Sequence, residues 1–164
     1  VRADFVIESF EPGYLKTLGL PYDQLAEINP RLILTSISPY GQSGPRCHYK
    51  TSDLVSIATG GQMYTLGDRD RPPVRVSYPQ AYSIAGTHEA AGTLLAHWYR
   101  ERTGSGQHVD VSIQASVILV TQDVTLFWDL TSTNVERAGR FRRRPGRPLP
   151  RRAPARRRAP LRGS

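Results

Sequence analysis

Apolar positions in the first part of the chain follow strand-like runs and helix-like spacing in turn. The segments ADFVIESF (3–10) and NPRLILTSIS (29–38) are short, apolar and partly β-branched, so both predict strands. Between them, PYDQLAEI (21–28) places Leu25 and Ile28 at helical spacing. Strands separated by helical segments form a βαβ pattern, which predicts a parallel sheet with a right-handed crossover.

The rest of the body continues this alternation. TSDLVSIATGG (51–61) predicts a helix that begins with Thr51 or Ser52 as N-cap and stops at its two glycines. Residues 80–102 form the longest helical run, QHVDVSI predicts a third strand, and QASVILVTQDVTLFWDL predicts one apolar helix. The fold class is therefore α/β, with helices flanking a parallel sheet.

The start of the longest predicted helix carries no charge. In SYPQAYSIAGTHEAAG (77–92), no carboxylate and no base occurs before His88. Pro79 fits at or just before the first helical turn, and Gly86 and Gly92 favour close packing against another backbone. We therefore ask what this uncharged helix start faces.

A polar loop, YGQSGPRCHYK (40–50), follows the second predicted strand. In open α/β sheets, ligands bind beyond the carboxyl ends of the strands. The loop is thus the first place to expect a binding site.

The charge is divided unevenly between body and tail. Residues 137–164 hold 12 arginines and no acid, so residues 1–136 hold 22 − 12 = 10 basic residues against 14 acids, a net charge of −4. The tail is rich in Arg, Pro, Ala and Gly, which predicts disorder and no specific nucleic-acid binding. Its composition is also typical of GC-rich DNA read in a shifted frame.

Several familiar sites are absent from the sequence. His88 and His97 are nine positions apart rather than one helical turn, and with one cysteine we expect no metal site. GSGQHV (104–109) follows a helix instead of opening one, so it predicts a helix C-cap and turn, not a dinucleotide fingerprint. No Ser-His-Asp grouping is evident.

The cysteine content and the hydropathy pattern bear on location. A single cysteine, Cys47, excludes a disulfide framework and favours a reducing, cytoplasmic setting. No apolar run reaches the roughly 18 residues of a membrane span, so we expect no membrane association.

A longer series of motifs resembles one family. The series comprises ESFEPG (8–13), LGLPYDQL, INPRLI, SISPYGQSGP and, further on, GTLLAHWYRERTGSGQHVDVSIQASV. These segments occur in order over about residues 3–125, and together they resemble the family III CoA-transferases.

This resemblance implies both architecture and partners. It implies a partial Rossmann-like sheet, with residues 1–136 forming the central part of the family's large domain and residues 137–164 forming the tail. The first strands and the small domain of the family would then lie outside this sequence. Family members are two interlocked chains that use coenzyme A as a substrate and no further cofactor.

The resemblance also implies which residues contact CoA. The family's ESF-x-PG loop and the helix after it run along the CoA molecule, and a basic residue lies near its phosphates. The matching positions here are Ser9, Pro12, Gly13, Leu18 and Lys50.

The family's catalytic position is occupied by an unexpected residue. In these enzymes an aspartate near the start of the long helix attacks the acyl-CoA thioester, forming a mixed anhydride and then an aspartyl-CoA thioester. Tyr82 matches that position, and its phenol, with a pKa near 10, would form an ester instead. Glu89 lies about 10 Å further along the helix at 1.5 Å per residue, and Asp53 fits a helix cap better. The catalytic residue is therefore unknown from the sequence.

Three interpretations follow. The first is a CoA-transferase subunit, either in an interlocked homodimer or in a heteromer with an Asp-bearing subunit. The second is a catalytically silent CoA-binding subunit or pseudoenzyme. The third group, an acyl-CoA racemase or a nucleic-acid binder, ranks lower, since Ser52 stands where the racemase histidine aligns and the body is acidic.

Overall fold

The computed structural model describes residues 3–139, and a three-stranded parallel sheet lies at its centre. The strands are β1 (Phe5–Glu8), β2 (Ile33–Ser38) and β3 (His108–Ser112), in the spatial order β1-β2-β3. Both pairings are parallel, which confirms the predicted α/β class. The central strand is almost entirely buried, as expected for an apolar run covered on both faces.

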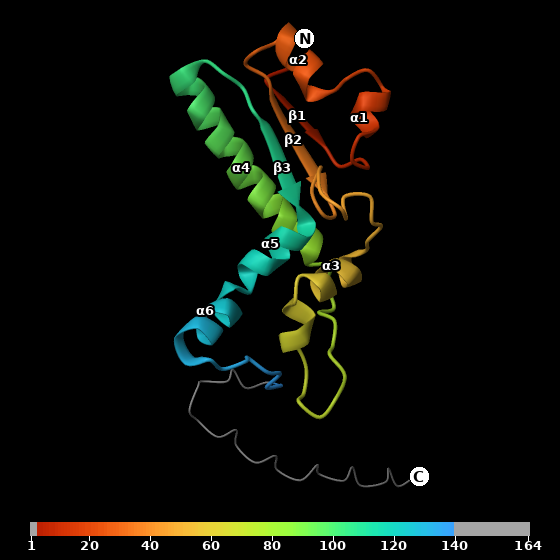
Figure 1. The fold of residues 1–164 in the computed structure, drawn as a ribbon, viewed down its shortest axis with the longest axis vertical. Coiled ribbons are helices and arrows are strands. Elements are labelled where there is room, and N and C mark those ends of the chain that lie inside the picture. The colour runs from red at the N-terminus through yellow and green to blue at the C-terminus, as the bar shows by residue number, and fades with distance from the viewer. Residues whose placement is uncertain (1–2, 140–164) are drawn as a thin grey trace, which may run out of the picture.

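Helices cover the two faces of this sheet (Figure 1). The long α4 (Ala81–Thr103) lies along one face, where the hydroxyl groups of Thr35 and Thr93 are 2.7 Å apart. The short α1 (Tyr14–Thr17) and α2 (Tyr22–Ile28) connect β1 to β2, and the ring of Tyr22 stacks on His108 of β3. Because strand side chains alternate between faces, α2 and α4 pack on opposite sides.

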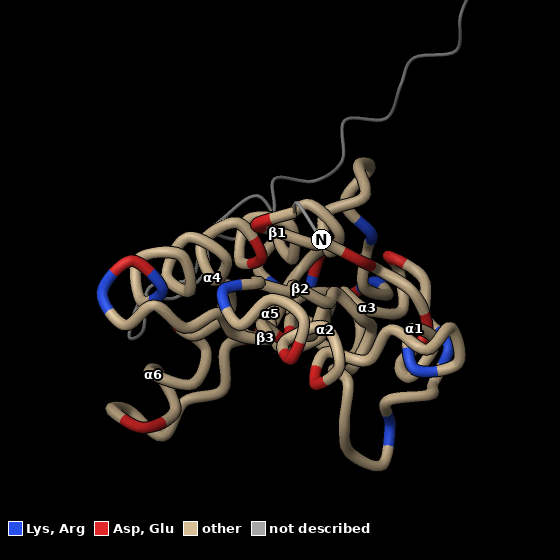
Figure 2. The backbone as a smooth tube through the Cα atoms, turned by 90° about the horizontal axis from the view of Figure 1, so that it is seen from above, with Lys and Arg blue, Asp and Glu red and all other residues tan. Residues whose placement is uncertain are grey.

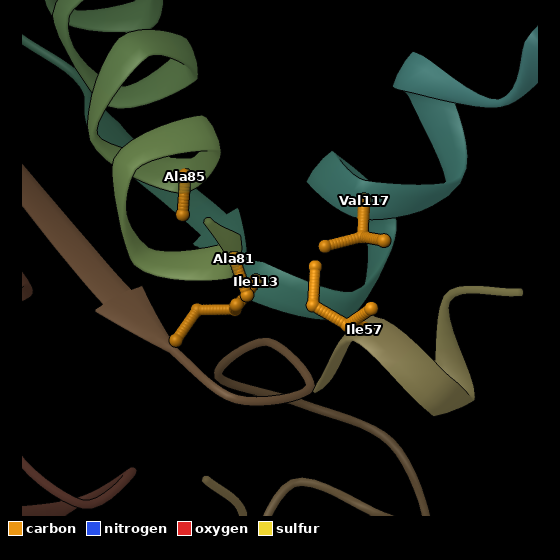
Figure 3. Packing of buried hydrophobic residues seen from close by; sticks show 5 residues of the cluster. All are labelled: Ile57, Ala81, Ala85, Ile113 and Val117. Atoms are coloured by element: carbon orange, nitrogen blue, oxygen red, sulfur yellow. The ribbon is translucent and has the colours of Figure 1, made fainter. Parts of the chain in front are cut away.

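A compact apolar cluster lies beyond the carboxyl ends of the strands (Figure 3). It joins α3 (Asp53–Thr59), the first turns of α4, and α5 (Ile113–Val120). A single turn of 3₁₀ helix, η1 (Gln62–Thr65), adds Met63 to the cluster. The buried members are Ile57, Ala81, Ala85, Ile113 and Val117. The start of α4 is therefore held in place by α3 and α5.

The boundaries of α4 follow its local sequence. The helix begins two residues after Pro79, and it ends at Gly104, whose φ of 80° is left-handed and whose amide donates to the carbonyl of Arg100. This confirms the helix C-cap predicted for the GSGQ segment. Gly92 faces the side chain of Val109 on β3, whereas Gly86 has no described neighbour close enough to require glycine. The close packing against another backbone that was predicted at both glycines is therefore wrong: Gly86 has no close described neighbour, and the neighbour of Gly92 is a side chain.

The final apolar segment is broken where one helix was expected. It forms α5 and then α6 (Gln122–Thr131), with Thr121 between them at φ −110° and ψ 18°. The amide and hydroxyl of Thr121 both donate to the carbonyl of Ile118, which tightens the last turn of α5 and ends it.

The tail predicted from Arg137 lies mostly outside the described residues. Its first three residues, 137–139, are described, and the Arg137 guanidinium donates to the carbonyl of Tyr64 at 3.1 Å. The amide of Gly139 donates to the carbonyl of Gly67 at 2.9 Å. The start of the tail thus rests against the loop that follows η1.

Candidate functional site

A cleft of about 300 Å³ opens beyond the carboxyl ends of β1 and β2. This is the position at which parallel α/β sheets bind ligands. One wall comes from the loop after β1 and the other from the loop after β2. The lining residues are Ser9, Phe10, Glu11, Pro12, Pro39, Cys47, His48, Tyr49, Lys50 and Thr51. Ser9, Pro12 and Lys50, all singled out from the sequence, thus come together here.

The first wall is shaped by hydrogen bonds at the end of β1. The buried carboxylate of Glu8 accepts a 2.7 Å bond from the amide of Phe10, which turns the chain out of the strand. The amide of Tyr14 donates to the carbonyl of Glu11 at 2.9 Å, and Gly13 adopts a left-handed φ of 86° before α1. Residues 9–12 are therefore presented as a fixed turn.

The second wall is a series of tight turns that ends at α3. The amide of Tyr49 donates to the carbonyl of Arg46 at 2.9 Å, and the Tyr49 ring meets the ring of Tyr40 edge-on. At the end of this wall, the hydroxyls of Thr51 and Ser56 are 3.0 Å apart. The wall is thereby attached to the apolar cluster through α3.

The cleft combines one ammonium group with aromatic surface. Lys50 supplies the positive charge, with Glu11 as the opposing carboxylate. Phe10 is 51% exposed and Tyr49 is 60% exposed, so both rings remain accessible to a ligand. Figure 2 shows acidic and basic positions interspersed along the described backbone. A preference of the cleft for an anionic ligand would therefore come from the charged side chains that line it. The arrangement suits an elongated ligand with an anionic group and an apolar or ring-bearing part.

Two of the expected CoA-binding residues lie outside this cleft. Leu18 is the C-cap of α1 and is 53% exposed. Gly13 instead lines an adjacent cavity of about 240 Å³ between α1, α2 and the sheet. The five residues expected to contact CoA therefore lie in three places: the cleft, its neighbouring cavity and the surface of α1.

The adjacent cavity is polar and contains a perturbed phenol. The imidazole of His108 is 2.9 Å from the hydroxyl of Ser36, and the Tyr22 ring stacks on it with ring centroids 5.3 Å apart. Burial raises the pKa of Tyr22 above its ordinary value of 10.0, and the charge of Asp23 raises it further. This phenol therefore remains protonated to a higher pH than a free tyrosine.

Tyr82 lies on the first turn of α4, outside the cleft. Its side chain is 48% exposed, while its neighbour Ala81 is completely buried. The amide of Ala81 donates a 2.8 Å hydrogen bond to the carboxylate of Asp53. Asp53 is thus a cap, but of α4 and not of its own helix, whose N-cap is Ser52. The sequence therefore predicted correctly that Asp53 caps a helix, but the helix is α4 and not the α3 to which Asp53 belongs.

Some residues of the cleft were not singled out from the sequence. Phe10, Cys47, His48, Tyr49 and Thr51 all line it. The available signal was their position in loops that leave the carboxyl ends of parallel strands. Residue type alone does not mark them.

The described residues hold no evident metal centre and no membrane helix. Within residues 3–139, no group of three or more His, Cys, Asp or Glu side chains is arranged to hold a metal ion. Across the same residues, no helix combines the length and apolar character needed to cross a bilayer.

Comparisons with known proteins agree on one family. Residues 1–154 match the family described as CoA-transferase family III. Succinyl-CoA:(R)-benzylsuccinate CoA-transferase subunit BbsE of Thauera aromatica is 39% identical over 145 residues, which are 88% of this chain and 34% of that protein. Acetyl-CoA:oxalate CoA-transferase of Acetobacter aceti is 38% identical over 139 residues, covering 84% of this chain and 36% of the relative.

The fold has solved counterparts. The crystal structure of a CAIB/BAIF family protein from Brucella suis superposes with a TM-score of 0.78 at 32% identity, over 82% of this chain and 36% of that one. The chain spans about a third of the length of the curated relatives that it matches. With the sequence match, the parallel sheet and the structural match in agreement, the chain belongs to CoA-transferase family III.

Proposed function

We propose that this chain is part of a CoA-transferase subunit that moves CoA between an acyl-CoA and a carboxylic acid. The observation that carries the proposal is the convergence of Ser9, Pro12 and Lys50 on one cleft at the carboxyl end of the sheet. The acyl-CoA is the ligand we assign to this cleft. The relatives of this chain that are named above act on CoA thioesters and carboxylic acids, which supports the same substrate classes here.

Each part of the cleft has a counterpart in CoA. The ammonium of Lys50 suits a phosphate as a point charge. The hydroxyls of Ser9 and Thr51 suit the amides of the pantetheine arm, and the exposed rings of Phe10 and Tyr49 suit its apolar segments. At about 300 Å³, the cleft accommodates a part of CoA rather than the whole molecule. Coenzyme A is a substrate in this scheme, and no further cofactor is proposed.

A second candidate is favoured by Tyr82. A tyrosine at the family's nucleophile position supports a CoA-binding subunit without chemistry of its own, working in a heteromer with an Asp-bearing subunit. The Thauera aromatica relative is itself named as a subunit. An interlocked homodimer is the corresponding assembly if another residue of this protein performs the attack. For both assemblies, the single cysteine supports a cytoplasmic location.

CoA titration tests the binding part of the proposal. In isothermal titration calorimetry, we expect saturable binding of CoA and a rise in Kd of up to about fivefold for Lys50→Gln, since an accessible charge pair contributes up to about 1 kcal/mol. Arg69→Gln is the matched control, because it removes one exposed charge near Glu136, away from the cleft. Equal effects of the two substitutions, or no saturable binding, would overturn the assignment of the cleft.

Reconstitution separates the two candidates. The chain is mixed with an Asp-bearing family subunit, and CoA transfer from a labelled acyl-CoA to a carboxylic acid is followed by chromatography. Transfer that requires both proteins supports the silent partner. Transfer by this chain alone supports a catalytic subunit. The nucleophile is then another residue of this chain, because position 82 is a tyrosine and not an aspartate.

A further inference from the structure

Three successive residues connect the cleft to the start of α4. Thr51 lines the cleft and pairs with Ser56. Ser52 caps α3 by accepting from the amide of Val55 at 3.4 Å. Asp53 then accepts the 2.8 Å hydrogen bond from the amide of Ala81, across 28 positions of sequence. One wall of the cleft is therefore bonded, through a single side chain, to the residue before Tyr82.

The carboxylate of Asp53 accepts one hydrogen bond, from the amide of Ala81, and forms a long ion pair with Arg75. The residue is only 7% exposed, and the bond from Ala81 is buried. Its other oxygen, Oδ2, is buried and has no hydrogen-bond partner among the residues that the structure describes. The Nε of Arg75, on a half-exposed side chain, is 4.0 Å from Oδ2. A buried carboxylate oxygen without a hydrogen bond is costly, and the guanidinium of Arg75 offsets that cost only through its charge.

The position of this carboxylate explains why it is tolerated. Asp53 is the first residue of α3 and contacts the first residue of α4, so two helix N-termini surround it with their partial positive charge. Its partner Ala81 belongs, with Ala85 and Ile57, to the buried cluster of Figure 3. With these alanines packed and the Ala81 amide bonded, the first turn of α4 has little freedom to rotate or slide.

We propose that Asp53 is a positioning residue for acyl transfer: it holds the first turn of α4, and hence residue 82, in a fixed position relative to the cleft wall formed by residues 47–51. The proposal rests on the proposed function, since it assumes that the acyl-CoA lies in the cleft. Asp53 does not attack the thioester, because both of its oxygens are inaccessible. Loss of its hydrogen bond leaves the cleft wall in place and frees the helix start.

A thiol introduced by Tyr82→Cys reports on this register without relying on the native nucleophile. Its thiolate attacks the carbonyl carbon of acetyl-CoA, so a new S-acyl bond forms at position 82 while the old thioester bond breaks and CoA leaves as its thiolate. The experiment uses the full chain with Cys47→Ser, so that no other thiol competes. Mass spectrometry gives the labelling rate at each acetyl-CoA concentration, and hence a saturating rate and a half-saturation concentration.

Two substitutions of Asp53 are compared in that background. For Asp53→Ala, we expect the saturating rate to fall about tenfold or more while the half-saturation concentration changes less than about twofold, since small misplacements of reacting groups are costly. For Asp53→Asn, whose amide oxygen still accepts from Ala81, we expect the rate to recover to within about threefold of the parent. Thr35→Val is the control: it also removes a hydrogen bond to α4, a partly buried one, but about 18 Å further along the helix.

Each outcome has a distinct meaning. Saturable labelling that Asp53→Ala leaves unchanged, or that Thr35→Val lowers equally, overturns the positioning role and leaves the proposed function intact. Labelling of the parent that never saturates with acetyl-CoA overturns the proposed function, and the positioning role with it. If Asp53→Ala fails to fold, the test rests on Asp53→Asn. Slow amide exchange at Ala81 shows whether its hydrogen bond to residue 53 is retained. A tenfold loss of the saturating labelling rate despite a retained bond contradicts the proposal.

Discussion

The amide of Gly106 donates a 2.7 Å hydrogen bond to the carbonyl of Pro30, bringing the turn after α4 against the turn before β2. The approach is so close that a Cβ on residue 106 would overlap the carbonyl group of Leu32. Only glycine fits at this point. The contact aligns β2 and β3 at their amino ends, opposite the cleft.

The first prediction concerns this close approach. We expect Gly106→Ala to lower the free energy of unfolding by at least about 3 kcal/mol, because a backbone carbonyl cannot move aside as a side chain can. Gly86→Ala is the control. It lies within α4 with no close neighbour, and we expect it to raise stability by about 0.5–1 kcal/mol. Urea denaturation followed by circular dichroism measures both, and a similar loss for the two would contradict the geometry.

The second prediction concerns Arg100, a buried cation on α4. Its Nη1 donates to the carbonyls of Asp4 and Arg31 and to the carboxylate of Asp4, and its Nη2 lies 3.0 Å from the imidazole of His97. A lysine cannot reach these acceptors together, so we expect Arg100→Lys to cost about 2–4 kcal/mol of unfolding free energy.

Arg102→Lys is its matched control. The Arg102 guanidinium lies over the Trp98 ring at 4.4 Å on an exposed part of the same helix. We expect a change within about 0.5 kcal/mol. If Arg100→Lys proved equally mild in thermal unfolding, the hydrogen bonds of Arg100 would not be holding α4 to the sheet.

The third prediction concerns the raised pKa of Tyr22. Burial is the larger cause and Asp23 the smaller, so we expect Asp23→Asn to lower this pKa only in part. Because the folded chain keeps the Tyr22 proton longer than the unfolded chain, the contribution of this group to stability is complete below pH 10.0 and falls as pH rises toward the folded pKa. The difference in absorbance at 295 nm between the unmodified chain and Tyr22→Phe isolates the titration. A midpoint at or below pH 10 would contradict the burial of this phenol.

The fourth prediction concerns Tyr82. The family reaction begins with attack by an aspartate carboxylate, which a tyrosine at position 82 does not supply, so we expect no acyl group bound to the chain. Incubation with radiolabelled acyl-CoA, followed by hydroxylamine trapping, measures this. Labelling that is lost in Tyr82→Phe would assign the acyl group to Tyr82, and labelling that persists in Tyr82→Phe would identify a different nucleophile. Repeating the assay with Glu89→Gln would show whether Glu89 is that residue.

The sequence predicted the framework well because local patterns determine it. The β-branched run 33–38 is buried between two layers, and Gly104 ends α4 with the left-handed conformation that glycine permits. The break at Thr121 was not predictable in the same way. The segments on both sides of it are rich in apolar residues, and the break depends on hydrogen bonds of Thr121 to the preceding turn.

The candidate site was predicted in part, for a physical reason. Ser9, Pro12 and Lys50 follow strands whose carboxyl ends meet at one edge, so their proximity follows from the topology. The bond between Asp53 and Ala81 joins positions 28 apart in sequence, and it depends on how α3 and α4 pack. No periodicity or motif encodes such a contact. The separation of Leu18 from the cleft likewise depends on how α1 is oriented, and not on its spacing from Ser9.

The location of the cleft residues and of residue 82 on different elements has an evolutionary consequence. The cleft is built from residues 9–51, whereas Tyr82 lies on another element and is half-exposed beside the buried Ala81. A change of codon 82 therefore alters neither the binding wall nor the apolar cluster. If the cleft binds acyl-CoA as proposed, a copy that loses its nucleophile after a gene duplication keeps both its fold and its ligand site. Selection on such a copy then acts on affinity and assembly rather than on turnover.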